Sequence, residues 1–422
     1  MSTQSLMHLR DASRSGRPHG IASICSAHDL VIDAALRQAT GSGEEVLIEA
    51  TCNQVNQDGG YTGMTPADFR DFVFNIADRV RFPRSRIILG GDHLGPNPWK
   101  HLPAEDAFAK ASAMIAAYAA AGFEKLHLDT SMGCLGEPAH LPDDIVAERA
   151  ARLAAQAETA ATAKPVYVVG TEVPTPGGAT DAMDHLTPTG QAAVARTFAV
   201  HEAAFRASAP EAWSRVIAIV VQPGVEFSHD AVAVYQPDKA TTLAASLREM
   251  PGLVFEAHST DYQPESALAR LVRDGFSILK VGPALTFALR EALYGLDAID
   301  HFLHPEFRSL GGTMEALMLA NPQHWTSHYG GSPAQQRLLR HFSYSDRIRY
   351  YWSFLEAQAA TSALFTRLSA APIPAPLVSQ YLPRLYERVA SGDLPAEPRA
   401  LALQSVRDVL EIYTRATARI EP

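Results

Sequence analysis

Short runs of apolar residues recur along the first two thirds of the chain, and each is followed by a polar or glycine-containing turn and then a helical pattern. The runs span residues 21–25, 46–50, 86–89, 125–128, 166–169, 216–221, 253–256 and 278–281. Most are apolar at consecutive positions, which is typical of parallel strands covered on both faces. The pattern therefore predicts eight strand–helix units.

The intervening segments carry ordinary helix signals. Thr65 can cap a helix, Pro66 suits its first turn, and Asp68 favours the positive end of its dipole. An alanine-rich stretch at 104–121 ends at Gly122, a natural C-terminal stop. Eight such units over about 275 residues fit a (β/α)8 barrel better than an open doubly wound sheet. The open sheet stays an alternative, because a count of strands does not prove closure.

Beyond Asp297 the helical pattern continues without further apolar strand runs. We therefore divide the chain into a polar N-terminal segment at 1–20, a barrel at 21–296 and a helical C-terminal module at 297–422. That module is expected either to pack on the barrel or to serve oligomerisation, and we expect an oligomer.

Composition narrows the class of protein. The formal net charge of −10 and the scattered basic residues argue against nucleic acid as a partner. The polar start argues against a secretory signal, and the apolar runs are too short to span a membrane. Three cysteines, Cys25, Cys52 and Cys134, show no paired spacing. We expect them to be reduced, buried thiols in a cytoplasmic protein.

Polar residues gather where the predicted strands end, which is where barrels place their chemistry. They are Glu49, Asn53 and Gln54 after the second run, Asp92 and His93 after the third, His127 and Asp129 at the fourth, Glu172 after the fifth, Gln222 after the sixth, His258 after the seventh, and Lys280 and Gly282 at the eighth. Each alone fits a cap or a turn. Their shared position predicts one polar site, because burying so many polar groups separately is costly.

Two histidines on opposite sides of the ring, His93 and His258, can share one divalent metal. Glu172 and Gln222 are the expected additional ligands. Zinc is the preferred ion, with magnesium or manganese as alternatives. Asp92 is expected to act as the catalytic acid and base, with Glu172 as a second catalytic candidate. His28, His127 and Asp129 are weaker candidates, and His127 has the stronger structural explanation because it lies within a strand.

A phosphate is expected at the loops after the seventh and eighth runs, on backbone amides near Ser259, Thr260 and Gly282. Lys280 fits either a charged lining or a Schiff-base nucleophile, and the histidines favour the non-covalent route. Glu49, Asn53, Gln54 and Asp129 complete the expected substrate-binding set. The expected ligand is thus a small phosphorylated molecule.

Several long motifs resemble the Z-subunit (GatZ/KbaZ) family of class II D-tagatose-1,6-bisphosphate aldolases, which includes D-tagatose 6-phosphate 4-epimerases. The matching stretches are residues 49–70, 90–96, 170–174, 221–227, 256–263, 279–291 and 345–352. The resemblance implies a class II aldolase-like TIM barrel and a place in galactitol or tagatose catabolism. It also implies that Asp92 and His93 match the catalytic aspartate and the first zinc histidine of the catalytic class II aldolases, and that His258 matches their zinc histidine on strand seven. Gln222 stands where that family of aldolases has a third zinc histidine.

The resemblance leaves two functions open. One is a metal-dependent epimerase that cleaves and re-forms the C3–C4 bond of tagatose 6-phosphate, with Asp92 handling the proton of the C4 hydroxyl. The other is a non-catalytic subunit that supports a separate class II aldolase. We favour the epimerase, because Asp92, His93, Glu172 and His258 occur together. The sequence has neither a GxGxxG after a strand nor a P-loop, so nicotinamide chemistry and a kinase lack support.

Overall fold

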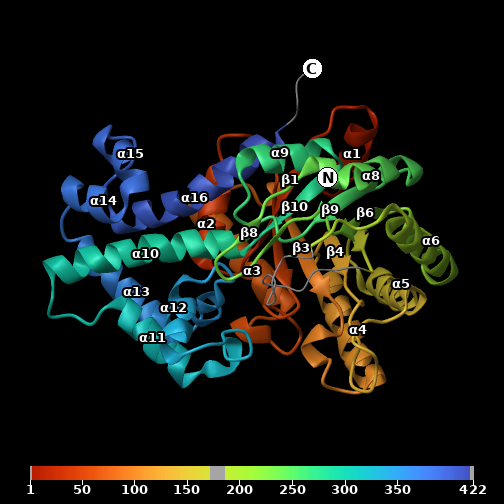
Figure 1. The fold of residues 1–422 in the computed structure, drawn as a ribbon, viewed down its shortest axis with the longest axis horizontal. Helices are drawn as coiled ribbons and strands as arrows, with labels where there is room; N and C mark the ends of the chain where they lie inside the picture. The colour runs from red at the N-terminus through yellow and green to blue at the C-terminus, as the bar shows by residue number, and fades with distance from the viewer. Residues whose placement is uncertain (1, 172–185, 419–422) are drawn as a thin grey trace.

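A computed structural model describes residues 2–171 and 186–418, and in it eight parallel strands close into a barrel (Figure 1). The strands are β1 (Ile21–Cys25), β2 (Val46–Thr51), β3 (Ile87–Leu94), β4 (Lys125–Leu128), β5 (Val166–Val169), β6 (Val216–Val221), β9 (Val254–Ala257) and β10 (Phe276–Val281). Ser23 of β1 pairs with Leu47 on one side and with Lys280 on the other. This pairing closes the ring, so the barrel is confirmed and the open sheet is excluded.

Helices surround the ring between successive strands. They are α2 (Asp29–Ala39), α3 (Pro66–Val80), α4 (Ala104–Ala120), α5 (Asp143–Ala160), α6 (Gln191–Ser208), α7 (Pro210–Trp213), α8 (Pro237–Ser246), α9 (Glu265–Arg273) and α10 (Pro283–Leu303). The Thr65 hydroxyl accepts a hydrogen bond from the Asp68 amide, as its sequence position predicts. Gly122 follows α4 with a φ of 85°, a left-handed conformation that glycine adopts without strain.

A small hairpin stands outside the barrel sheet. Its strands, β7 (Glu226–Phe227) and β8 (Val232–Ala233), pair antiparallel. The sequence analysis did not predict it, because two-residue strands are too short to show an alternating pattern. The hairpin brings Phe227 to the mouth of the barrel, where its side chain lines a cavity.

The N-terminal helix α1 (Ser2–Arg14) covers the end of the barrel at which the strands begin. Its buried residues Leu6 and Leu9 pack in one cluster with apolar side chains of the strands, among them Leu47, Ile88 and Val254. The segment that was expected only to be polar therefore carries an apolar face. That face keeps water from the end of the barrel opposite the polar residues, and so stabilises the ring that positions them.

Replacing Leu6 by alanine is expected to lower the free energy of unfolding by about 2–4 kcal/mol, because the fully buried side chain leaves a cavity in a packed cluster. Urea-induced unfolding followed by circular dichroism measures the change. The matched control is Gln4→Ala on the exposed side of the same helix, which should shift stability by less than about 0.5 kcal/mol. Equal stability of the Leu6 variant and the wild type would show that α1 does not support the barrel.

The C-terminal region continues from α10 as α11 (Leu310–Ala320), α12 (Pro333–Phe342), α13 (Leu355–Leu368), α14 (Ala375–Tyr381), α15 (Tyr386–Ala390) and α16 (Pro398–Thr417). Most of these helices lie to the left of the barrel in Figure 1, and α16 returns along it to pack against α2, α9 and α10. The Tyr413 hydroxyl of α16 donates a hydrogen bond to the Thr260 carbonyl at 2.7 Å. Helix α16 is therefore tied to the rim of the barrel.

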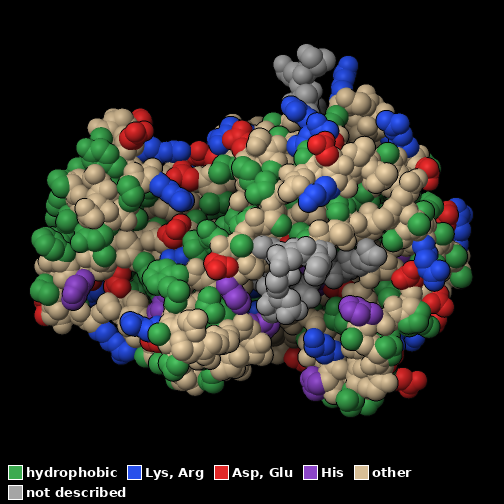
Figure 2. Space-filling view, in the orientation of Figure 1, with side chains coloured by type: hydrophobic (Ala, Val, Ile, Leu, Met, Phe, Trp, Pro, Cys, Tyr) green, Lys and Arg blue, Asp and Glu red, His purple; other side chains and the backbone are tan. Residues whose placement is uncertain are grey.

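Hydrophobic side chains gather on the surface of this helical region (Figure 2). The exposed ones include Phe302, Leu303 and Phe307 near the end of α10, and Leu355 at the start of α13. Exposed apolar surface of this kind is typical of protein interfaces, in line with the predicted oligomer, which stays a prediction. Within the described residues, no helix is both long and apolar enough to cross a bilayer.

Candidate active site

The polar site lies inside the barrel, toward the C-terminal ends of the strands, and its residues come from strands on several sides of the ring. Two pairs of residues show why: Lys125 and His127 on β4, and Glu256 and His258 at the end of β9. Residues two apart on a strand share one face, so each pair points to the same side of the barrel wall. All four side chains are buried.

Three imidazoles meet at this site. The ring centroids of His93 and His258 lie 4.9 Å apart, those of His93 and His127 5.1 Å apart, and those of His127 and His258 5.0 Å apart. The structure thus brings the two predicted ligands, His93 and His258, to one place. It adds His127, which the sequence analysis ranked lower because of its position within a strand.

Each imidazole is held through one nitrogen by a carboxylate. His93 Nδ1 lies 2.8 Å from Asp129 Oδ2, His127 Nδ1 lies 2.9 Å from Asp92 Oδ1, and His258 Nε2 lies 2.9 Å from Glu256 Oε1. In a neutral ring whose proton is on the carboxylate-bonded nitrogen, the lone pair is on the other nitrogen, namely His93 Nε2, His127 Nε2 or His258 Nδ1. The His93 amide also lies 3.1 Å from His127 Nδ1, and Asp92 and Asp129 raise the pKa of His93 against the effect of burial. A carboxylate behind each ligating histidine is the usual second layer of a metal site.

These residues fit a divalent cation. His127 Nε2 is buried and has no hydrogen-bond partner among the described residues, so it is a candidate ligand atom in the tautomer that carries its proton on Nδ1. Burial lowers the pKa of His258 to about 3, which keeps its lone pair free of a proton at neutral pH. One ligand atom each from Asp92, His127, Glu256 and His258 lies within 4.8 Å of the others. Two imidazoles and two carboxylates form a donor set that zinc accepts. His93 is not part of this group and stays a predicted ligand.

The backbone of His93 has an unusual, strained conformation. His93 has a φ of 49°, in the left-handed region that residues with a Cβ rarely adopt. The register of β3 against β4 shifts between Gly91 and Leu94, around this position. Such a conformation persists only where the surroundings enforce it, and it is common at functional sites.

A cluster of buried charges supports the imidazoles from below. Lys125 Nζ lies 2.6 Å from Glu49 Oε1 and 2.7 Å from Glu256 Oε2, and all three side chains are fully buried. Lys280 Nζ contacts Glu49 and lies 2.6 Å from Asp92 Oδ1. Because each charge has an opposite partner, the cost of burying it is offset only while the whole cluster is intact.

Lys280 is an ammonium cation in this cluster. Burial would lower its pKa, but Asp92, Cys25, Glu256 and Glu49 together raise the pKa well above its ordinary value. A Schiff base requires a neutral amine, so the charge state disfavours that alternative. Lys280 instead neutralises the carboxylates around it.

Asp92 is held as a carboxylate. Burial alone would raise its pKa, but His93, Lys280 and the hydrogen bond from His127 hold the pKa well below its ordinary value. Its Oδ1 atom is occupied by Lys280 and His127. Its Oδ2 atom is less engaged, 3.6 Å from Cys25 Sγ and 3.9 Å from His93 Nε2.

Several other predicted residues line a cavity above this cluster. Asn53, Gln54, Ser259, Lys280 and Gly282 do so, together with Asp92, His93 and His258. Glu49 and Asp129 do not line this cavity. Glu49 is bonded to Lys125, and Asp129 is bonded to His93. Their expected contact with the substrate stays a prediction.

Other predicted contributors are already engaged elsewhere. The Gln222 side-chain oxygen accepts hydrogen bonds from the amides of Gly224 and Val225 at 2.8 and 3.0 Å, so it caps its own turn instead of facing the imidazoles. The Thr260 hydroxyl is 2.5 Å from the Lys280 carbonyl. His28 caps α2 through the Leu30 amide.

Glu172 lies outside the described residues. The three cysteines are free thiols, with Cys52 and Cys134 buried as expected.

Sequence reasoning missed part of the site. Lys125 was not proposed, and Glu256 was noticed beside His258 but given no role, although their two-residue spacing from His127 and His258 marks one strand face. Arg349 and Tyr350 were also missed. They come from the short helix η7 (Arg347–Tyr351) far along the chain and line the same cavity. The motif at 345–352 was noticed, but its position over the barrel mouth depends on the tertiary fold.

Comparison with known proteins identifies the family. The profile of the family described as D-tagatose-1,6-bisphosphate aldolase subunit GatZ/KbaZ-like matches residues 6–418. The chain belongs to the GatZ/KbaZ-like family. The chain is also 53% identical over 422 residues to the D-tagatose 6-phosphate 4-epimerase of Agrobacterium fabrum. This comparison covers 98% of this chain and 99% of that protein.

Solved structures agree with the fold of this GatZ/KbaZ-like chain. The crystal structure of a probable tagatose 6-phosphate kinase from Sinorhizobium meliloti 1021 superposes with a TM-score of 0.89 at 57% identity, covering 94% of this chain and 100% of that one. The glycerol complex of the fructuronate-tagaturonate epimerase UxaE from Cohnella laeviribosi gives a TM-score of 0.50 at 11% identity, covering 94% and 81%. The second comparison shows a shared fold alone.

Proposed function

We propose that the chain is a metal-dependent 4-epimerase that interconverts D-tagatose 6-phosphate and D-fructose 6-phosphate. The observation that carries the proposal is the convergence of three carboxylate-backed imidazoles beside an ionised Asp92. The name of the relative at 53% identity supports the same activity. The crystal structure at 57% identity carries a kinase name, but the sequence has no P-loop to hold ATP phosphates.

The substrate's own chemistry favours bond cleavage. The carbonyl at C2 acidifies the proton on C3 but not the one on C4. Inversion at C4 without a redox cofactor therefore proceeds by breaking the C3–C4 bond. The C4 hydroxyl loses its proton, the C3–C4 electron pair moves into an enediolate over C3 and C2, and glyceraldehyde 3-phosphate is released within the site. The aldehyde turns its other face, the bond forms again, and the C4 oxygen regains a proton.

The chain's residues fit the steps of this route. Asp92 Oδ2 accepts the proton of the C4 hydroxyl and returns it after the bond re-forms. Lys280 stays charged beside Asp92 and stabilises its carboxylate. His93, His127 and His258 would hold a divalent cation, with zinc preferred for its affinity for imidazole, and the cation would supply positive charge for the oxygens at C2 and C3. Glu172 stays proposed as an additional ligand, whereas the hydrogen bonds to the Gln222 side-chain oxygen argue against the same role for Gln222.

The purified chain alone, assayed by carbon-13 NMR, should convert D-tagatose 6-phosphate to D-fructose 6-phosphate without ATP. Chelation should abolish turnover, and zinc, manganese or magnesium added separately should show which ion restores it. Turnover that survives complete metal removal would contradict the proposal. So would consumption of ATP, or an inert chain that only raises the activity or half-life of a separate class II aldolase subunit.

A further inference from the structure

The loops expected to bind phosphate are already occupied by the chain itself. At the start of α10, the amides of Gly282 and Ala284 donate to Asp261 Oδ1 at 3.0 and 2.8 Å. The hydroxyl of Thr260 bonds to the carbonyl of Lys280, and the ammonium of Lys280 is surrounded by carboxylates. A phosphate dianion placed there would face Asp261 instead of free donors, so another group has to neutralise it.

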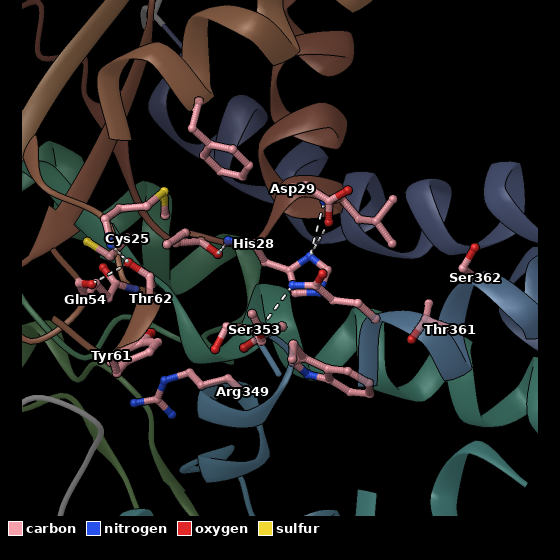
Figure 3. Close-up of a pocket in the computed structure, with 18 of the residues that line it drawn as sticks. Cys25, His28, Asp29, Gln54, Tyr61, Thr62, Arg349, Ser353, Thr361 and Ser362 are labelled. Carbon is pink, nitrogen blue, oxygen red and sulfur yellow. Dashed lines mark hydrogen bonds and ion pairs between the residues drawn. The ribbon is translucent and has the colours of Figure 1, made fainter. Parts of the chain in front are cut away.

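Arg349 lies at the boundary between two cavities. One is the cavity above the imidazoles, and the other is a larger one of about 580 Å³ beside it; both are lined by Cys25, Gln54, Tyr61 and Arg349. Figure 3 shows the Arg349 guanidinium next to Tyr61, away from His28 and Asp29 at the other end of the larger cavity. A substrate that reaches from Asp92 toward the opening therefore passes this arginine.

The Arg349 guanidinium interacts electrostatically with the nearby Asp346 but is not paired with it directly. It donates to the carbonyls of Ser345 and Asp346, and its Nη2 lies 3.0 Å from the Tyr350 hydroxyl. It forms no ion pair with a carboxylate in the part of the chain that the structure describes. Two other arginines on the wall of the larger cavity do: Arg79 and Arg399 lie 3.8 and 2.8 Å from Asp33.

Two tyrosines beside Arg349 add hydrogen-bond donors of suitable character. The rings of Tyr61 and Tyr350 meet edge to face at a centroid distance of 4.7 Å, and the Arg349 guanidinium carbon lies 4.5 Å from the centre of the Tyr350 ring. Burial holds the pKa of Tyr61 well above its ordinary value, so its hydroxyl stays protonated and can donate. A guanidinium with adjacent hydroxyl donors suits the oxygens of a phosphate monoester.

We propose that Arg349, with Tyr61 and Tyr350, binds the phosphate group of the substrate. The inference rests on the proposed function, in which C4 lies at Asp92 and the phosphate on C6 extends toward the opening. The C-terminal region thereby completes the substrate site of the barrel. It selects a sugar that carries a terminal phosphate over the same sugar without one.

The test measures binding separately from catalysis. Calorimetric titration of the metal-free protein with D-tagatose 6-phosphate should show a dissociation constant about 10- to 100-fold higher for Arg349→Gln than for the wild type, since hydrogen bonds to charged groups are worth that much. Arg349→Lys, which keeps the charge and folds more safely, should lie between the two. Arg79→Gln is the matched control in the same cavity and should bind like the wild type.

The phosphate group itself provides the specific readout. Unphosphorylated D-tagatose should bind wild type and Arg349 variants alike, whereas damage to the fold would weaken both sugars. Unchanged affinity for D-tagatose 6-phosphate in both Arg349 variants would overturn the inference, and so would a loss confined to Ser259→Ala. A wild-type protein that binds the sugar phosphate through Arg349 but never epimerises it would refute the proposed function alone.

Discussion

Replacing Asp92 by asparagine is expected to lower kcat for the 4-epimerisation by about 10³-fold, within the usual range for removing a general base. Asparagine has nearly the same shape, but its amide cannot take the C4 hydroxyl proton at any relevant pH. The neighbouring Lys280 keeps Glu49 as a carboxylate partner, so we expect the barrel to stay folded. Product formation by NMR under saturating substrate measures kcat.

The matched control for this variant is Asp58→Asn, which removes an exposed carboxylate paired with Lys110 far from the imidazoles. It should leave kcat unchanged, and circular dichroism should show both variants folded. If Asp92→Asn retained kcat within about threefold of the wild type, Asp92 would not be the acid and base, because even modest general-base catalysis is worth more.

Replacing His127 by glutamine is expected to remove the bound metal and to lower kcat by about 10²–10³-fold, since a cation contributes several kcal/mol to stabilising developing negative charge. Glutamine retains bulk and polarity but lacks the imidazole nitrogen at Nε2, which is buried without a partner. Metal content by mass spectrometry and kcat should fall together.

His201 offers an unusually close control for His127. It is also fully buried, its Nδ1 is bonded to a backbone carbonyl, and its Nε2 also lacks a partner among the described residues. It lies on α6, outside the barrel. His201→Gln should therefore keep metal content and kcat, even if it costs some stability. Equal metal content in the His127 variant and the wild type would show that His127 is not a ligand.

The barrel could be predicted because parallel strands buried on both faces leave an unbroken apolar signature, and each of the eight runs overlaps an observed strand. The pairing of His93 with His258 could be predicted as well, since strand ends in a barrel meet at one mouth. His127 was ranked low because it lies within its strand. The neighbouring Lys125, two residues earlier, was the missed signal that this face of β4 points to a polar interior.

The remaining site residues depend on contacts that no local pattern encodes. Gln222 has the chemistry of a ligand, but the turn after β6 has its own amides to satisfy and uses the side-chain oxygen. Gly282 has a backbone amide at the start of a helix, but this amide already donates a hydrogen bond to Asp261 from another loop. Arg349 reaches the cavity only because the chain folds back over the barrel mouth after α12.

The most direct test of the central claim is an anomalous difference map from crystals of the wild-type protein grown with zinc. We predict one peak within about 2.0–2.2 Å of His93 Nε2, His127 Nε2 and His258 Nδ1. An empty cluster between these three nitrogens, in crystals of protein that still epimerises D-tagatose 6-phosphate, would contradict it.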